Sequence, residues 1–233
     1  MNGGWLGDLL TVYRTAFGRG LSLAARNPVL VVPTLAYFYV PALAMALLAP
    51  LGFLAGLILV LLESTCWSAM LACTGDVIRT GRTSMDDVRR GFTTHLWDVI
   101  NVRFVLWVLF LVLSMVPMSP IVIIVWIAVF VFFNAVPELI YLGRYGTTDL
   151  LVESYRFVSE NWITWFPANL VLLVASVALI RVVGEIPGAL GQTVLILALA
   201  IMLAVALTVR GVLFLELTQS SRRARAFRRA TGT

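Results

Sequence analysis

Hydrophobic residues follow one another along this chain in long runs, and short segments between the runs carry most of the charges. The run from Val29 to Leu62 contains no charged residue and is much longer than the ~20 residues that cross a bilayer. Pro50 and Gly52 divide it, because proline ends a helix and glycine favours a turn. The pattern therefore predicts two membrane-spanning helices in this run.

Prolines and glycines divide the later runs in the same way. Pro117 and Pro120 interrupt the run that ends near residue 141, and a segment with Gly184 and Gly188 separates the last two helices. We expect an all-α integral membrane protein with six transmembrane helices in one domain, residues 1–221, followed by a tail, 222–233. The expected spans are about 29–49, 51–73, 99–117, 120–142, 162–180 and 192–217.

A two-faced helical pattern precedes each pair of spans, at about residues 5–25, 84–98 and 148–161. In the second segment, Ser84 and Asp87 have the spacing of a helix-capping box. Helices with one apolar and one polar face lie in the membrane interface. The sequence thus predicts three helical hairpins, each preceded by a cytoplasmic amphipathic helix that we call an elbow.

Residues 27–33 and 161–167 both begin with Asn and end with Pro, which indicates an internal repeat of this unit. Few other residues are identical, and the alternative is that both segments contain residues common at any membrane interface.

Stretches at 135–139 (Ala-Val-Pro-Glu-Leu), Gly143 and 149–162 resemble the signature of a broad bacterial group of six-helix membrane proteins. This group is related to the membrane domain of glycerophosphoryl diester phosphodiesterases. Residues 27–28 (Asn-Pro) fit the same pattern, whereas Met118 stands where a glycine commonly follows the Val-Pro pair. The resemblance covers most of the chain and implies a six-helix membrane fold in a group largely of unknown function. It implies no enzymatic activity, because the chain contains no phosphodiesterase catalytic domain.

Arginine placement predicts the orientation. All but two of the 17 basic residues fall in the N-terminal segment, in the connections after the second and fourth spans, or in the tail. The exceptions are Arg181 on the opposite side and Arg210 within the sixth span. Since basic segments are retained in the cytoplasm, we expect a multi-pass protein of the bacterial cytoplasmic (inner) membrane with both termini cytoplasmic.

Composition excludes a soluble domain, since 61% of the residues are hydrophobic and 12% are charged, against about 45–50% and about 25% in soluble proteins. The net charge of +5 is dispersed between apolar runs, so nucleic acid is not an expected partner. Cys66 and Cys73 lie about 10 Å apart along one helix and cannot pair with each other. Two cysteines and one histidine form no zinc site, and we expect neither a metal nor another cofactor.

Charged and polar side chains inside spans are candidate functional residues, because they are costly in a bilayer. Helix depth, at about 1.5 Å per residue, puts Glu138 and Arg210 together near the inner interface, and puts Glu63 level with Asn134. These four residues form either a polar cavity open to the cytoplasm or a structural ion pair with snorkelling side chains.

The remaining polar motifs predict no active site. His95 and Asp98 lie three residues apart, but no nucleophile or oxyanion-binding group accompanies them, so we expect no enzyme. The tail is a candidate surface for anionic lipid or for an acidic cytosolic partner. Its basic residues are Arg222, Arg223, Arg225, Arg228 and Arg229.

The absence of catalytic motifs and the short outer connections favour a non-enzymatic scaffold or accessory subunit of a membrane assembly. Such a subunit would contact membrane lipid and another membrane or cytosolic protein, and an oligomer is compatible with it. The alternative is a small transporter or channel with a polar path on the second, fourth and sixth spans. An enzyme acting on lipids is a more distant third possibility.

Overall fold

The computed structural model describes residues 5–117, 119–143 and 146–219, and these residues form helices without any strand. Six candidate spans are long and apolar enough to cross a membrane, which agrees with the expected number and is typical of a multi-pass membrane protein. The elements are α1 (Trp5–Arg26), η1 (Pro28–Leu30), α2 (Val31–Leu48), η2 (Ala49–Leu51), α3 (Phe53–Thr80), α4 (Met85–Thr94), α5 (Leu96–Ser114), α6 (Pro120–Phe132), α7 (Val136–Leu142), α8 (Thr147–Gly184) and α9 (Gly188–Gln219).

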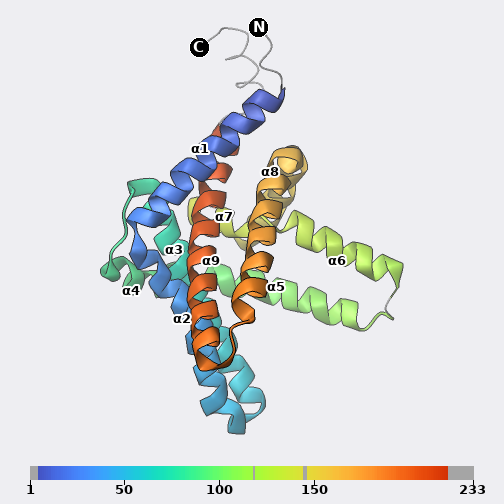
Figure 1. Cartoon of the computed structure of the whole chain (residues 1–233). Coiled ribbons are helices and arrows are strands. Elements are labelled where there is room, and N and C mark those ends of the chain that lie inside the picture. Colours follow the sequence, from blue (N-terminus) through green and yellow to red (C-terminus); the bar gives the residue numbers. More distant parts are fainter. Residues whose placement is uncertain (1–4, 118, 144–145, 220–233) are drawn as a thin grey trace.

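Four long helices, α2, α3, α8 and α9, pack side by side, and we refer to them as the bundle (Figure 1). The α2–α3 turn contains η2 and Gly52, whose φ of 54° is a conformation that glycine adopts without strain. At the other end of α3, Gly81 has a φ of 83° and caps the helix. The helix continues beyond the predicted end at residue 73, because Gly81 is the first helix-breaking cap after that position.

Helix α1 lies across α9 at the end of the bundle where both helices approach the chain termini (Figure 1). Ala16 and Gly20 on α1 are buried in this contact. A Cβ atom at Gly20 would lie only 2.7 Å from the Cα atom of Val209 on α9. The absence of a side chain at Gly20 therefore allows the two helices to approach closely.

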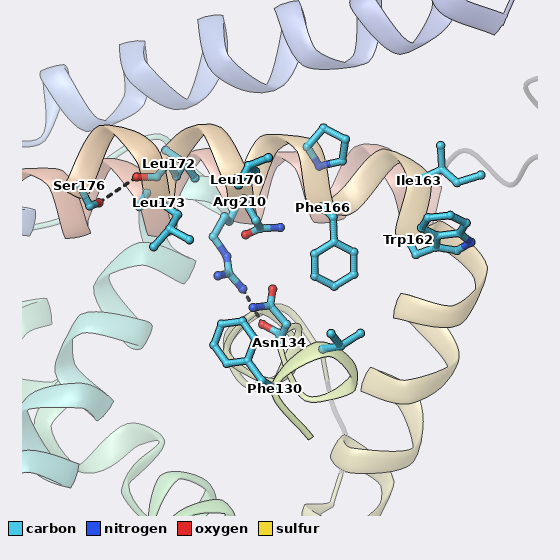
Figure 2. Close-up of a pocket in the computed structure, with 14 residues that line it drawn as sticks. Phe130, Asn134, Trp162, Ile163, Phe166, Leu170, Leu172, Leu173, Ser176 and Arg210 are labelled. Carbon is cyan, nitrogen blue, oxygen red and sulfur yellow. Dashed lines mark hydrogen bonds between the residues drawn. The ribbon is translucent and has the colours of Figure 1, made fainter. Parts of the chain in front are cut away.

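The predicted elbow segments adopt different structures. Segment 5–25 is the separate helix α1, and segment 84–98 contains α4, whose Ser84 and Asp87 form the expected capping box. The third, 148–161, is not a separate helix, because α8 is continuous from Thr147 to Gly184. Figure 2 shows α8 bending near Trp162 and Ile163, so this segment is the first part of a bent helix.

Pro167 lies within α8 and gives a physical reason for the bend. Proline has no N–H to donate, and its ring crowds the carbonyl of the residue four positions earlier, here Ile163. The next carbonyl, that of Thr164, accepts a hydrogen bond of 2.8 Å from the Tyr13 hydroxyl of α1. The proline kink thus explains why the predicted boundary between the third elbow and the fifth span is a bend within α8.

Helices α5 and α6 run crosswise to the bundle and point away from it, and we call this hairpin, residues 96–132, the arm (Figure 1). The rings of Phe110 and Trp126 connect its two helices, with centroids 5.7 Å apart. Most of its large apolar side chains are exposed, among them Phe110, Ile121 and Ile124. The sequence predicts this segment as one of three hairpins, and its helices run in a different direction from those of the bundle (Figure 1).

Candidate functional site

The fourth candidate span is broken in the middle. α6 ends at Phe132 and α7 begins at Val136, with Pro137 in the first turn of α7. A continuous helix is prevented there, because Pro137 lacks an N–H and its ring would clash with the carbonyl of Phe133. Residues 133–135 therefore form an irregular turn that exposes backbone carbonyl groups.

Each carbonyl at the break is bound by a donor. The Ser154 hydroxyl donates to Phe132 O over 2.6 Å, and the Val136 amide donates to Phe133 O over 3.2 Å. Arg210 on α9 donates from Nη2 to Asn134 O over 2.6 Å. Irregular backbone at membrane depth requires such partners, because hydrocarbon offers no hydrogen bonds.

Arg210 also binds Glu138 with two hydrogen bonds. Its Nε donates to Oε1 over 2.8 Å and its Nη2 donates to Oε2 over 2.9 Å. The side chain of Glu138 is completely buried, whereas 18% of the Arg210 side chain is exposed. The expected pairing of these two residues is present, and the guanidinium covers the carboxylate.

Trp165 on α8 completes the group. Its ring lies 5.2 Å from the Arg210 guanidinium carbon, at a cation–π distance, and its Nε1 donates to Asn134 Oδ1 over 3.0 Å. Phe157 and Phe214 pack against the same ring. We call Asn134, Glu138, Trp165 and Arg210 the Arg210 cluster.

Helix α7 holds Glu138 in a fixed position. The Tyr141 hydroxyl donates to Leu207 O over 3.0 Å, and Arg79 Nη2 donates to Tyr141 O over 2.7 Å. A Cβ atom at Gly75 would lie 3.1 Å from that same carbonyl oxygen, so α3 and α7 approach closely. These contacts bind one turn of α7 to both α3 and α9.

A cavity of about 870 Å³ lies between α6 and α8 and reaches α9 at Arg210 (Figure 2). Its lining is mainly apolar, with Phe130, Phe166 and Leu170 among the lining residues. Phe130 and Leu170, which line it, are also largely exposed, so part of the lining lies at the molecular surface. We refer to it as the α6–α8 cavity.

Glu63 is not bonded to the other three predicted site residues. Its Oε2 accepts a hydrogen bond of 3.0 Å from Nη1 of Arg103 on α5, while Asn134 is bonded to Trp165 and Arg210. Depth along a helix places residues along the axis but does not specify the direction in which they point. The expected group of four is therefore a group of three joined by Trp165, with Glu63 in a separate ion pair.

Sequence reasoning missed two of these partners. Arg103, which the arginine pattern counts with the connection after the second span, lies two turns inside α5, which begins at Leu96. Trp165 lies in the apolar run of the fifth span, although a buried indole N–H needs an acceptor. That requirement, together with Asn134 in a neighbouring span, is the signal that indicates the contact.

The remaining candidate residues are placed as follows. Cys66 and Cys73 are buried free thiols on α3. His95 Nδ1 lies 3.7 Å from Asp98 Oδ2 at the start of α5. Within the described ranges, no group of three His, Cys, Asp or Glu side chains could hold a metal ion. Arg222, Arg223, Arg225, Arg228 and Arg229 lie outside the residues that the structure describes.

Comparison with known proteins gives this chain no relative. No protein-family model, no curated protein and no solved structure matches it. The resemblance to the membrane domain of glycerophosphoryl diester phosphodiesterases therefore stays a prediction.

Proposed function

We propose that this chain is a non-enzymatic membrane protein that serves as an accessory subunit or scaffold, with the arm as its contact to another membrane protein. The observation that carries the proposal is the direction of the arm, which runs crosswise to the four bundle helices (Figure 1). When the bundle helices cross the bilayer, an arm in this direction lies along the membrane plane.

In that orientation, the backbone polar groups at the tip of the arm need hydrogen-bond partners. The last carbonyls of α5 and the first amides of α6 have no partners within their own helices. Ser119 Oγ accepts from the Val122 amide over 3.4 Å, which satisfies one of these groups. The carbonyls of Leu111, Val112 and Leu113 also accept local hydrogen bonds, from Ser114 Oγ and from the amides of Met115 and Val116. Hydrocarbon cannot bond to any polar group that remains at the tip, so an arm inside the membrane favours protein around it.

The chemistry of the arm indicates the kind of partner. Phe110 on α5 and Ile121 and Ile124 on α6 are exposed apolar side chains. A partner with transmembrane helices can pack on these side chains and supply donors and acceptors to the tip. We therefore propose a membrane-embedded protein as the partner of the arm.

The proposal includes an orientation in the bacterial cytoplasmic membrane. Arg82, Arg89 and Arg90 are exposed around α4, at the end of α3 opposite the η2 turn. Basic residues in short connections favour the cytoplasmic side. This supports cytoplasmic termini and a basic cytoplasmic surface formed by α1, α4 and the first part of α8, with anionic lipid or a cytosolic protein as its partner.

Site-specific crosslinking in native membranes tests the partner. A photoreactive residue at Ile124 on the arm is expected to form an adduct with another protein. The control is a photoreactive residue at Leu47 near the end of α2, which is similarly exposed (71% against 63%) and should form lipid adducts only. An adduct of twice the 25.6 kDa chain mass would identify a second copy instead of a different subunit. Lipid adducts alone at both positions would contradict the proposal.

Cysteine labelling tests the direction of the arm. In a chain with Cys66 and Cys73 replaced by alanine, Phe53→Cys beside the α2–α3 turn should react with a membrane-impermeant maleimide added outside. Val116→Cys at the tip of the arm should not react, because a partner covers it. Equal labelling of both positions would mean that α5 and α6 cross the bilayer in the ordinary way, and the proposed contact would be wrong.

A small transporter or channel is the alternative. Its polar path would have to connect Glu63 with Asn134, Glu138 and Arg210, but in the described structure Glu63 is bonded to Arg103. Solute flux in proteoliposomes that Glu63→Ala and Glu138→Ala leave unchanged would rule out this path.

A further inference from the structure

The α6–α8 cavity ends at a cation with unused hydrogen-bond donors. Arg210 donates from Nε and Nη2 to Glu138 and Asn134, whereas its Nη1 donates to none of the residues that the structure describes. Glu138 is completely buried and is not among the residues that line the cavity, whereas Arg210 is, so the cavity meets the cation of the pair (Figure 2). A ligand in this cavity needs an oxygen that can accept a hydrogen bond.

The rest of the cavity is suited to a hydrocarbon chain. Phe130, Phe166, Leu170 and Leu173 supply apolar lining, and they belong to candidate membrane spans. A volume of about 870 Å³ is within the range of small-molecule sites, roughly 300–1,000 Å³. Because exposed apolar side chains of candidate spans form part of this lining, the molecules with access to it are those of the bilayer.

The charge of the site selects the acceptor group. Arg210 is already neutralised by Glu138, so a second anion would leave the site with a net negative charge. A neutral carbonyl oxygen can accept from Nη1 without that cost. Arg210 lies about 12 Å from the end of its span at Thr218, at about 1.5 Å per residue, which is a depth that the ester groups of a lipid can approach.

We propose that the α6–α8 cavity binds one diacyl phospholipid, with an acyl chain along the apolar lining and its ester carbonyl accepting a hydrogen bond from Arg210 Nη1. The headgroup contributes little, so zwitterionic and anionic lipids should bind similarly. The site shares Phe130 and Val131 with the arm, but its test measures bound lipid and does not depend on a protein partner.

Native mass spectrometry of the full chain measures lipid retention directly. Delipidated protein is incubated with phosphatidylcholine, with phosphatidylglycerol, or with an ether-linked phosphatidylcholine that lacks the ester carbonyls. We expect one retained lipid per chain for both ester lipids. Retention of the ether lipid should be about tenfold weaker, because it loses a hydrogen bond to a charged donor.

Filling the cavity provides a second measurement. Ala206→Leu places a larger side chain in the lining one turn before Arg210, and retention should fall at least about tenfold. Ala198→Leu on the same helix, a position outside the α6–α8 cavity, is the matched control and should retain lipid normally. If Ala206→Leu does not fold, Ser176→Leu fills another part of the lining.

The proposal would be overturned if the unaltered protein retained no ester lipid, or if the ether lipid bound as well as the ester lipid. It would also be overturned if the cavity-filling variant retained as much lipid as the Ala198→Leu control. The lipid comparison uses the unaltered chain, so it decides the role of Arg210 without a destabilising substitution. A strong preference for phosphatidylglycerol would also count against the carbonyl contact, since it would indicate a headgroup site.

Discussion

In the Arg210 cluster, each buried charged side chain is stable only while its partner is present. Glu138→Ala leaves the guanidinium of Arg210 without its counter-ion, and breaking a buried pair in this way costs about 3–5 kcal/mol. We expect a correspondingly lower free energy of unfolding for the variant in detergent. Thermal or denaturant unfolding of the purified protein measures it.

A double variant separates ionic dependence from lost packing. Glu138→Leu with Arg210→Met removes both charges and should recover much of the loss, because apolar residues of similar volume can replace a buried pair. Glu153→Gln, in an exposed pair with Arg156, is the control and should change stability by less than about 0.5 kcal/mol. If the double variant loses as much free energy of unfolding as the two single variants together, these residues do not stabilise the protein through their ion pair.

His95 gives the protein a pH dependence at the α4–α5 junction. Burial lowers the pKa of His95 below its ordinary value of 6.5 and Arg79 acts in the same direction, while Asp98 and Asp76 oppose them. The folded protein therefore binds this proton less readily than the unfolded chain does. The stability contributed by neutral His95 is fully present above pH 6.5 and is lost as the pH falls through the lowered pKa.

Melting temperatures at about pH 7.5 and about pH 5.5 test this effect. The unaltered protein should melt at a lower temperature at the acidic pH. His95→Gln, which cannot take up the proton, should show a smaller difference between the two conditions. An equal difference in both proteins would assign the pH dependence to other groups.

Residue-level prediction succeeded where distance along a helix was sufficient. Glu138 and Arg210 lie at similar depths in their spans, and counting residues predicts that they can meet. The contact between Arg103 and Glu63 depends on how α5 crosses α3, and no local pattern encodes that crossing. The sequence therefore shows which charged residues in the spans need a partner, but it identifies the partner only in some cases.

At the scale of elements, α1 and α9 fit together because Gly20 carries no side chain. Gly20→Ala would place a Cβ atom 2.7 Å from the backbone of Val209, and separating the helices to accommodate it should destabilise the protein by about 1–3 kcal/mol. Gly18→Ala on the same helix has nothing within 4 Å and is the matched control. It should be neutral or slightly stabilising, because alanine favours helix over glycine.

Unfolding of both glycine variants in the same detergent measures this contrast. Equal stability of the two would mean that α1 does not depend on its close approach to α9. Greater loss at Gly18 would contradict the described packing outright.

Prolines and glycines predicted the ends of elements more reliably than the breaks within them. Pro50 and Gly52 lie at the observed α2–α3 turn. Pro137 breaks the fourth span and Pro167 lies just after the bend of α8, yet their apolar neighbours favoured an uninterrupted helix in both runs. Hydrophobicity measures whether a segment can lie in lipid, whereas proline geometry decides its direction there.

For the whole molecule, the arrangement predicts which connections share a side of the membrane. Single cysteines at Arg82 and at Glu185, both exposed, should react with impermeant reagent from opposite sides. Arg82→Cys should require opened cells and Glu185→Cys should react in intact ones, with Cys66 and Cys73 replaced by alanine. Labelling of both positions in intact cells would contradict the orientation.

Hydropathy predicted the number of candidate spans but could not predict the direction of the arm. Residues 96–132 are as apolar as the other spans, so their composition is compatible with any direction inside a membrane. Direction follows from which surfaces pack together, and few side chains of α5 and α6 pack against the rest of the chain.

The packing of α1 on α9 also determines the order of folding, because α1 can pack only after α9 has been made. The ribosome makes α1 before α9, yet Val209 on α9 lies directly against Gly20. During translation, this surface of α1 therefore has no packing partner until α9 has been synthesised. A product that ends before α9 would leave this surface of α1 uncovered and open to recognition by cellular quality control.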